Sequence, residues 1–581
     1  MEEEKLIIKK NSDDYISANA QRYEILSNLY NINKDSYQEI IQQIKDHSDL
    51  FFKDHSSSIL FFYFITQTAK YKFKDLELIL DICVSFSSEI KRNNTTDTEL
   101  ITICYNFSNG LNYLFNKNFF TIESIVEKSI TCDQIFITFL PEIEKYDSEY
   151  ARLREKRLLS NPESNSNQKI IKYFQFVKSN PDHHISYRQL NYHPSPLHKS
   201  IRDDDVETFQ SLLSKNNFSV NHKIEQSFYE RLKMLIDDNL SLIQVAAFYG
   251  SINIFKFLWM QKNIEIDDNL LSYAYAGENI EIIHICEQKC PLTDAFLQPI
   301  FIHRTDLLDY YLDNFGDEII EKYDVIRYHL ENYAIDEDNL YDKLNYKGLS
   351  IALFTVNFDV LKFCLPKIVY ILRNIENTDK IFYNSSTRLL ENCIFDFEMF
   401  KFLFSQRKEN VKKSEVKNYF LALKECIYYS ANDATKYILN KLNEDKKHFS
   451  YAFINSIMCN NDVISNYILD LQLNEERNDK DSLFNFMVDD ININLLLHAM
   501  KHYNEDVVVK LLKLYKIIHG SQDLLLFVAS LNENLSSKMI MSLIDRISEF
   551  LPSGQLTEMA NIFKDLGGLD ISDQILNKVS K

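Results

Sequence analysis

The chain has 581 residues, of which 45% are hydrophobic and 13% aromatic, so it contains enough apolar side chains to bury a large core. Its formal net charge of −20 argues against nucleic acid as the main ligand, because phosphate binding requires a basic surface. The nine glycines and nine prolines are few for a β-rich protein with many tight turns. We therefore expect helices joined by short polar connections.

The cysteines and the N-terminal segment bear on the cellular compartment. Nine cysteines are scattered along the chain without a C-x-x-C pair, which favours a reducing environment. The first residues, MEEEKLIIKK, contain no apolar core of a secretory signal. The most apolar run, 59–66, is far shorter than the ~20 residues that span a bilayer. The sequence predicts a cytoplasmic protein without membrane insertion.

Residues 1–160 are predicted to form a helical N-terminal domain. Segments such as YEILSNLYNI and SYQEIIQQIKDH carry apolar residues at i, i+3, i+4 and i+7, which is the spacing of an amphipathic helix. Ser36 and Thr121 each precede such a segment and are expected to cap it. Residues 161–194 are expected to be a linker or connector, because a polar, unpatterned stretch is followed there by prolines and histidines.

From residue 195 to residue 545 one pattern returns several times. Its most complete version is SLIQVAAFYGSINIFKFLW at 241–259, which reads as two short apolar helices joined by a turn at Tyr249–Gly250. Two helices this short cannot bury both apolar stripes alone, so stacked repeats are predicted, closed by a C-terminal helical cap at 546–581. The copies begin near residues 195, 241, 270, 297, 347, 387, 423, 451 and 495, and a further copy is expected around 324–330.

One position of the pattern carries a charge in most copies. Asn253 in the most complete copy is replaced in the others by an acidic residue, which is expected in the first turn of the second helix. A negative side chain there complements the free backbone N–H groups and the helix dipole. These residues are Glu281, Asp306, Asp359, Glu398, Asp433, Asp462 and Asp506.

Two of the copies resemble the ankyrin repeat. Ser195-Pro196-Leu197-His198 is similar to the T-P-L-H signature that opens that repeat, and Ala246, Ala247 and Gly250 match its small residues and turn glycine. The whole chain resembles the divergent ankyrin-repeat proteins of trichomonad-type protists. The resemblance implies an all-α fold in which a helical N-terminal domain precedes an ankyrin-like α-solenoid of helix-turn-helix repeats. Helical hairpins of another repeat family are the alternative.

The known signatures of catalysis and cofactor binding do not occur. We find no glycine-rich phosphate loop, no G-x-S-x-G elbow and no H-E-x-x-H zinc helix, so we expect no enzymatic activity and no cofactor. The acidic cluster Asp203–Asp205 lacks the glycine and terminal glutamate of a calcium loop and is expected to cap a helix. Cys286 and Cys290 are expected to pack in the core at a helix end.

Four histidines within sixteen residues are a candidate metal site. Their imidazoles could supply nitrogen ligands, but one of them belongs to the S-P-L-H signature, where the resemblance implies a hydrogen bond within the repeat turn. The others lie in a connector flanked by prolines, so no metal site is predicted. The group consists of His183, His184, His193 and His198.

The resemblance implies recognition of a protein through the concave surface of the solenoid. By analogy with ankyrin repeats, the exposed positions would include Lys199, Arg202, Asp203, Phe248 and Tyr249, with packing against the next repeat as the alternative for Phe248. We expect a non-enzymatic scaffold for a protein partner that is basic or belongs to a large assembly. The alternative function is a structural component of a large cytoskeletal or organellar assembly.

Overall fold

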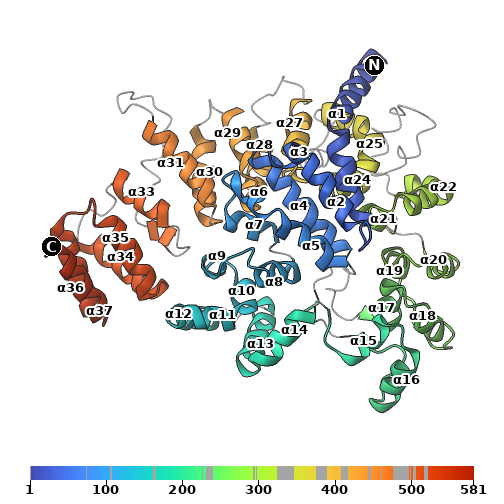
Figure 1. Cartoon of the computed structure of the whole chain (residues 1–581), viewed down its shortest axis with the longest axis horizontal. Helices are drawn as coiled ribbons and strands as arrows, with labels where there is room; N and C mark the ends of the chain where they lie inside the picture. The colour runs from blue at the N-terminus through green and yellow to red at the C-terminus, as the bar shows by residue number, and fades with distance from the viewer. Residues whose placement is uncertain are drawn as a thin grey trace. The chain divides into compact units, whose positions relative to one another are not determined.

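Figure 1 shows the computed structural model of the chain, which is all-α except for one two-stranded ladder in the part that it describes. It describes residues 2–580 apart from 73–74, 105–106, 161–164, 191, 225–226, 231–239, 292–294, 296, 323–345, 375–388, 407–415, 442–445, 460, 475–495, 498, 501–504 and 516–520. Among the helices of these residues, none is both long and apolar enough to cross a membrane. The further copy expected around 324–330 lies outside the described residues.

The chain divides into two compact units, each assembled from segments that are distant in sequence. Unit 1 contains Met1–Thr96, Cys104–Phe119 and His183–Asn418, and unit 2 contains the remaining residues. The N-terminal 160 residues are thus shared between both units, which differs from the predicted sequential domains. The predicted linker also contains two helices, α13 (Asn165–Ser179) and α14 (Pro181–Leu190).

Each helix is assigned to the unit that contains most of its residues. Unit 1 comprises α1 (Glu2–Asn28), η1 (Leu29–Asn31), α2 (Tyr37–Asp46), α3 (Ser48–Phe52), α4 (His55–Tyr71), α5 (Leu76–Ser85), α6 (Ser87–Arg92), α8 (Ser108–Asn116), α14, α15 (Pro196–Arg202), α16 (Val206–Lys215), β1 (Lys223–Ile224), β2 (Leu240–Ser241), α17 (Leu242–Tyr249), α18 (Ile252–Trp259), α19 (Leu270–Gly277), α20 (Ile280–Glu287), α21 (Leu297–Phe301), α22 (Thr305–Lys322), α24 (Tyr346–Phe354), α25 (Phe358–Asn374) and α27 (Phe397–Ser405).

Unit 2 comprises α7 (Asp97–Cys104), α9 (Ile122–Ser129), α10 (Asp133–Thr138), α11 (Leu140–Tyr146), α12 (Ser148–Leu159), α13, α28 (Val416–Tyr428), α29 (Asn432–Lys441), α30 (Lys446–Met458), α31 (Asp462–Asn474), α33 (Glu505–Tyr515), α34 (Ser521–Asn534), α35 (Ser537–Ile547), α36 (Ser553–Asp565) and α37 (Leu569–Val579).

The apolar run at 59–66 forms the middle of α4, which is buried along almost its whole length. A helix that is apolar on every side belongs in a core, and α4 occupies that place in unit 1. The Asp54 side chain begins the helix by accepting a hydrogen bond of 2.8 Å from the Ser57 backbone N–H. Thr121 caps α9 as expected, whereas the Ser36 side chain makes no capping bond to α2.

Pairs of consecutive helices from residue 196 onwards are joined by turns of one recurring geometry. In five such turns of residues 196–441, and again at Gly567 between α36 and α37, the residue with a left-handed backbone is followed by one whose N–H bonds to the carbonyl five positions back, as Ser251 does to Ala246 at 2.9 Å. This is the Schellman ending of a helix, and it satisfies carbonyls that the helix leaves free. The left-handed residues of the first five turns are Asp204, Gly250, His303, Val356 and Ser430, and Glu278 is left-handed at the turn between α19 and α20.

Neighbouring pairs are linked by side chains that follow these turns. The Asn279 amide donates to the carbonyl of the left-handed Gly250 at 3.1 Å. Asn357 and Asn461 donate to the carbonyls of Ile300 and Ile427, which lie three residues before a left-handed residue of the preceding pair. Each of the three asparagines also caps its own second helix. The expected acidic positions are confirmed, since all seven lie in the first turn of a second helix.

The first helices α17 and α19 approach each other very closely. A Cβ placed on Gly277 would lie 2.0 Å from the Ala247 carbonyl oxygen, so only glycine fits at this position. Ala246 and Ala247 are completely buried, as expected of small residues that admit a second helix. Before α17 the chain adds an antiparallel ladder that the sequence did not predict, with Lys223 opposite Ser241.

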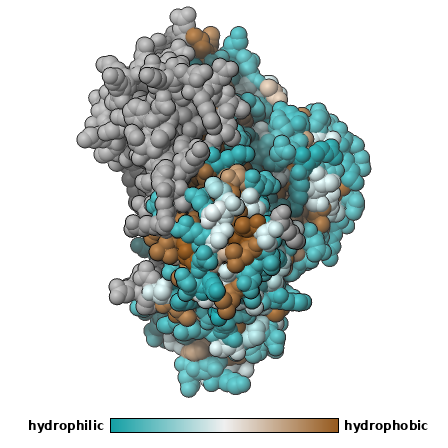
Figure 2. Space-filling model, turned by 90° about the vertical axis from the view of Figure 1, so that its left-hand side faces the viewer, coloured by the Kyte–Doolittle hydropathy of each residue, from teal (hydrophilic) through white to brown (hydrophobic). Residues whose placement is uncertain are grey.

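The helices α36 and α37 pack against each other at the C-terminal end of unit 2. Ile571 and Ile575 of α37 are buried, while Asp573, Asn577 and other polar residues are exposed. Exposed apolar side chains are fewer there and include Leu566, Leu569 and Leu576. Figure 2 shows a face on which hydrophilic residues predominate and apolar ones form separate patches.

Candidate functional site

The five predicted binding residues occupy different environments. Lys199 and Asp203 are exposed, as expected. Arg202 is half-buried, because its guanidinium lies 3.5 Å from the centre of the Tyr192 ring and pairs with the Asp203 carboxylate at 3.0 Å. The prediction that Phe248 and Tyr249 are exposed is wrong, since they are 6% and 5% exposed.

Phe248 and Tyr249 are buried because they end α17 inside unit 1. The Tyr249 ring packs edge-on against both Phe248 and His198, and its hydroxyl donates to the Glu230 carboxylate at 3.3 Å. For Phe248 the packed alternative is therefore the correct one. Burial raises the pKa of Tyr249 well above its usual value, and the nearby Glu230 carboxylate raises it further.

Both aromatic residues nevertheless line a cavity of about 390 Å³, here called the turn cavity, that lies entirely within unit 1. It is bounded on one side by the end of α4 and the residues after it, and on the other by residues of three helix-pair turns. Its lining residues are Tyr71, Lys72, Asp75, 248–250, 276–279 and Arg304. Two of the predicted binding residues, Phe248 and Tyr249, thus line this site, whereas its charged residues were not predicted.

An ion-pair network fills one wall of the turn cavity. Glu278 binds the Lys72 ammonium at 3.2 Å and the Arg304 guanidinium at 2.5 Å. Arg304 also binds both oxygens of Asp306, at 2.8 and 2.7 Å, and these bonds hold the pKa of Asp306 below its usual value. The two cations thus already have carboxylate partners.

The Asp75 carboxylate, on the same segment as Lys72, has no hydrogen-bond or ion-pair partner within the described residues. Asp75 immediately precedes α5, but its side chain makes no capping bond to that helix. The hydroxyl of Tyr71 is buried and has no partner among the described residues either. Of these two groups only the Asp75 carboxylate is accessible from the turn cavity, because the Tyr71 hydroxyl has almost no accessible surface.

His303 directly precedes Arg304, and its side chain packs in the core of unit 1. Its ring stacks on Tyr30, with 3.5 Å between the ring centres, and its Nε2 bonds to the Thr355 carbonyl at 3.2 Å. Burial lowers the pKa of His303 to about 3, against the opposing effect of that bond, so the ring is neutral at physiological pH and Nε2 is the donor. Its Nδ1 is buried without a partner in the described structure.

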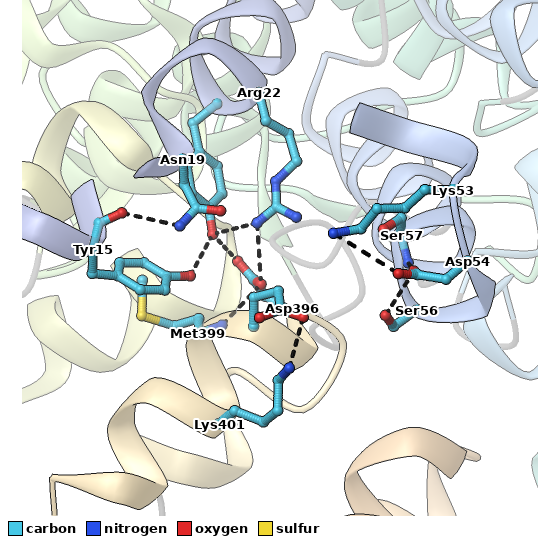
Figure 3. A network of polar contacts seen from close by, with 12 residues as sticks. Tyr15, Asn19, Arg22, Lys53, Asp54, Ser56, Ser57, Asp396, Met399 and Lys401 are labelled. Atoms are coloured by element: carbon cyan, nitrogen blue, oxygen red, sulfur yellow. Dashed lines mark hydrogen bonds and ion pairs between the residues drawn. The ribbon is translucent and has the colours of Figure 1, made fainter. Parts of the chain in front are cut away.

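A second polar cluster in unit 1 surrounds Asp396 and is drawn in Figure 3. The Asp396 carboxylate accepts a hydrogen bond from Tyr23, lies 3.7 Å from the Arg22 guanidinium, and caps α27 through the Met399 N–H at 3.1 Å. Tyr15 bonds to the Tyr23 hydroxyl at 3.1 Å. Because Arg22, Tyr23 and Asp396 are all buried, this cluster fixes α1 to α27 and is not accessible to a ligand.

A third cluster, in unit 2, brings buried charges together at the start of α31. Burial raises the pKa of Glu127 and of Asp462, each of which faces the other carboxyl group, and burial lowers the pKa of Lys128 between them. Thr98 donates to Glu127 at 3.3 Å. Asp462 Oδ1 is buried without a partner in the described part of the chain.

The histidine group does not converge on one point. His184 bonds through Nδ1 to the Tyr229 hydroxyl at 3.0 Å, whereas His198 stacks on His193 with 4.8 Å between the ring centres. The His198 Nδ1, for which the resemblance implied a bond within the turn, is buried without a partner among the described residues. In the described ranges no three His, Cys, Asp or Glu residues are arranged to hold a metal ion.

The cysteines are free thiols. Cys286 and Cys290 are buried at the end of α20, which confirms their predicted place in the core at a helix end. Comparison with family models, with curated proteins and with solved structures gives no match for this chain.

Proposed function

We propose that the chain is a non-enzymatic scaffold whose helix pairs form an ankyrin-like α-solenoid that binds a protein partner. The observation that carries this proposal is the recurring turn: a left-handed residue and a Schellman bond occur together at several turns, and at three turns an asparagine bonds to a carbonyl of the preceding pair. Such recurrence is typical of repeat proteins, in which each unit buries its apolar face against its neighbours. Recognition through an extended surface is the usual use of that architecture.

Contacts within unit 1 narrow the surface on which a partner could bind. The N-terminal helices already touch several turns: Tyr30 stacks on His303, Tyr63 donates to the Phe354 carbonyl at 2.7 Å, and Lys72 pairs with Glu278. These turns are partly covered by the chain itself. We therefore place the partner on the exposed residues of other first helices, such as Lys199 of α15, and at the turn cavity, which residues at the C-terminal ends of α17 and α19 line.

The test is cross-linking mass spectrometry on the full-length protein purified from its own cells. We expect a recurrent protein partner whose cross-links cluster on residues 195–545, with internal cross-links around the Lys72–Glu278 contact as the control for a folded sample. Partner cross-links confined to residues 1–160 would contradict the proposal. Sedimentation of the whole pool with a large particle would instead support the structural alternative.

A further inference from the structure

We infer that an exposed apolar surface of unit 2 binds an amphipathic helix of the protein partner, and that this helix presents two tyrosines on one face. The surface, here called the tyrosine patch, consists of Tyr428 and Tyr429 at the end of α28 and Met458 at the end of α30. The three side chains are 53%, 38% and 45% exposed. The inference rests on the proposed function and names the segment that the partner must present.

The tyrosine patch occupies a position that recurs at the turns of the helix pairs. Tyr428 lies two residues before the left-handed Ser430. Three turns of unit 1 carry a phenylalanine two residues before their left-handed residue, namely Phe248, Phe301 and Phe354. An aromatic side chain is therefore a regular feature of these turns, and the two units differ in what covers it.

Neighbouring turns are joined by an asparagine in the same way in both units. The Asn357 amide of unit 1 donates to the Ile300 carbonyl at 3.0 Å, and the Asn461 amide of unit 2 donates to the Ile427 carbonyl at 3.1 Å. Each isoleucine directly precedes the aromatic residue of its turn, and each asparagine lies three residues after the same position of the next turn. Tyr428 and Met458 of unit 2 therefore correspond to Phe301 and Phe354 of unit 1.

In unit 1 a single helix, α4, covers both of these phenylalanines. Tyr71 stacks on Phe301 with 5.1 Å between ring centres, and Tyr63 packs edge-on against Phe354 at 6.2 Å while its hydroxyl donates to the Phe354 carbonyl at 2.7 Å. The two tyrosines are eight positions apart, which is about 12 Å along the helix axis and comparable with the ~8–10 Å between packed helices. One helix with two tyrosines thus reaches two neighbouring turns.

In unit 2 the corresponding side of the turns is exposed. The N-terminal helix α7 contacts the other side, where the Asn432 amide at the start of α29 donates to the Glu99 carboxylate at 2.7 Å. In unit 1 that other side is contacted by α1, since Tyr23 stacks on Phe358 at the start of α25. Both sides of the turn are therefore covered in unit 1, whereas in unit 2 the side that carries Tyr428 offers its ring to a partner.

The groups of the tyrosine patch suit the chemistry that α4 supplies in unit 1. Tyrosine rings pack well against one another, and a methionine sulfur makes favourable contacts with aromatic rings. The Tyr428 carbonyl corresponds to the one that Tyr63 binds, and it accepts no hydrogen bond among the described residues. Because a helix leaves its last carbonyls free, a tyrosine hydroxyl of the partner can donate there. Two tyrosines eight positions apart are thus the feature that the partner helix requires.

The experiment measures binding of synthetic helices to the full-length protein by isothermal titration calorimetry. The probe is an alanine-rich peptide of about 20 residues, with lysine and glutamate for solubility and two tyrosines eight positions apart. A second peptide has its tyrosines nine positions apart, which places them on opposite faces because each residue turns the helix by about 100°. We expect saturable binding of the first peptide and about tenfold weaker binding of the second. A third peptide with alanine in place of both tyrosines should not bind.

Substitutions in the chain locate the binding at the tyrosine patch. Tyr428→Ala should weaken the first peptide about tenfold and Met458→Ala about fivefold, because each removes one of the two contacts. Tyr428→Phe keeps the ring and should retain the affinity. Leu525→Ala, which removes another exposed apolar side chain of unit 2, is the matched control and should change nothing. Circular dichroism of each variant shows whether it has kept its helical fold.

Three results would overturn the inference. The first is equal affinity of the two tyrosine peptides or the absence of saturation, and the second is unchanged binding by both alanine variants of the patch. The third is a dimer of the chain in analytical ultracentrifugation that Tyr428→Ala converts to a monomer, because a second copy and not a partner helix would then cover the patch.

The outcome also separates this inference from the proposed function. A protein partner cross-linked to residues 195–545 together with no binding of the tyrosine peptide would refute the role of the tyrosine patch and leave the scaffold function standing. Peptide binding that depends on Tyr428, without any recurrent protein partner from the cells, would support the patch and contradict the scaffold function.

Discussion

Arg22 on α1 and Asp396 at the start of α27 form a buried ion pair, with 3.7 Å between the guanidinium Nη2 and the carboxylate Oδ1. The same carboxylate accepts from Tyr23, whose ring stacks on Phe358 with 4.8 Å between ring centres. The pair therefore joins the first helix of the chain to a helix pair far along the sequence. Breaking such a pair on one side leaves a buried charge without compensation.

The first prediction concerns this pair. Asp396→Asn should destabilise unit 1 by about 3–5 kcal/mol, because Arg22 remains buried and charged after its partner is neutralised. Trp259 is the only tryptophan and lies in unit 1, so its fluorescence during urea unfolding reports on this unit alone. Glu398→Gln removes a more exposed pair with Lys401 and should cost less than about 1 kcal/mol. If both substitutions lowered the free energy of unfolding equally, burial of the Arg22–Asp396 pair would not increase its contribution to stability.

The second prediction concerns the close approach of α17 and α19. Gly277→Ala should destabilise unit 1 by about 2–3 kcal/mol or more, because the new methyl group overlaps the Ala247 carbonyl and the helices must separate. Gly554→Ala in α36 is the control, since nothing lies within 4 Å of the added methyl group. That substitution should be neutral or stabilise by up to about 1 kcal/mol, as alanine favours helices over glycine. Differential scanning calorimetry of both variants checks the contrast.

The features that the sequence predicts correctly depend on neighbours in sequence. Helix periodicity, the cap at Thr121 and the acidic first turns follow from residues a few positions apart, and all of these are found. The left-handed position of each turn was foreseen only at Gly250. Other turns use Val356 and Ser430, residue types that are not enriched in this backbone conformation.

The features that the sequence missed depend on contacts between distant segments. Nothing in the apolar pattern of α1 or α4 indicates which turns they meet, so the pairing of Lys72 with Glu278 had no signal. The burial of Phe248 and Tyr249 has the same origin, because it results from the other segments that make up unit 1. One sequence pattern does indicate contacts between neighbouring pairs. An asparagine recurs directly after several turns, as Asn279, Asn357 and Asn461 do, and its side chain bonds to the preceding pair.

The third prediction concerns the pH dependence of unit 2. Burial raises the folded-state pKa values of Glu127 and Asp462, so the folded unit binds their protons more tightly than the unfolded chain does. Stability should therefore fall as the pH rises from about 4, the unfolded value, towards the raised folded values. The lowered pKa of Lys128 acts in the opposite direction but at a higher pH, just below about 10.4.

Asp462→Asn removes one of these titrations and keeps the shape of the side chain. The variant should be more stable than the original chain by about 1–3 kcal/mol at pH 8, and the gain should shrink towards pH 4.5. Asp573→Asn, an exposed position on α37, is the matched control and should show no such trend. Calorimetry at four pH values between 4.5 and 8 measures the difference, and a gain independent of pH would contradict the proton linkage.

The fourth prediction concerns the pH dependence of unit 1, which should have the opposite sign. Burial lowers the pKa values of His198 and His303 to about 3, whereas an unfolded histidine has a pKa of about 6.5. Between these values the unfolded chain binds the additional protons, so stability is complete above pH 6.5 and falls as the pH drops towards 3. Each histidine contributes a slope of at most about 1.4 kcal/mol per pH unit.

His303→Asn should reduce this slope by about half, because the neutral amide does not titrate and asparagine tolerates the left-handed backbone at this position. Comparing slopes between pH 4.5 and 7.5, and not absolute stabilities, separates the titration from the packing that is lost with the ring. His183→Asn, at an exposed position of unit 1, should leave the slope unchanged. Urea unfolding followed by Trp259 fluorescence gives both slopes. If the His303 variant retains the original slope, His303 must titrate alike in the folded and unfolded chains, and its burial does not control its charge.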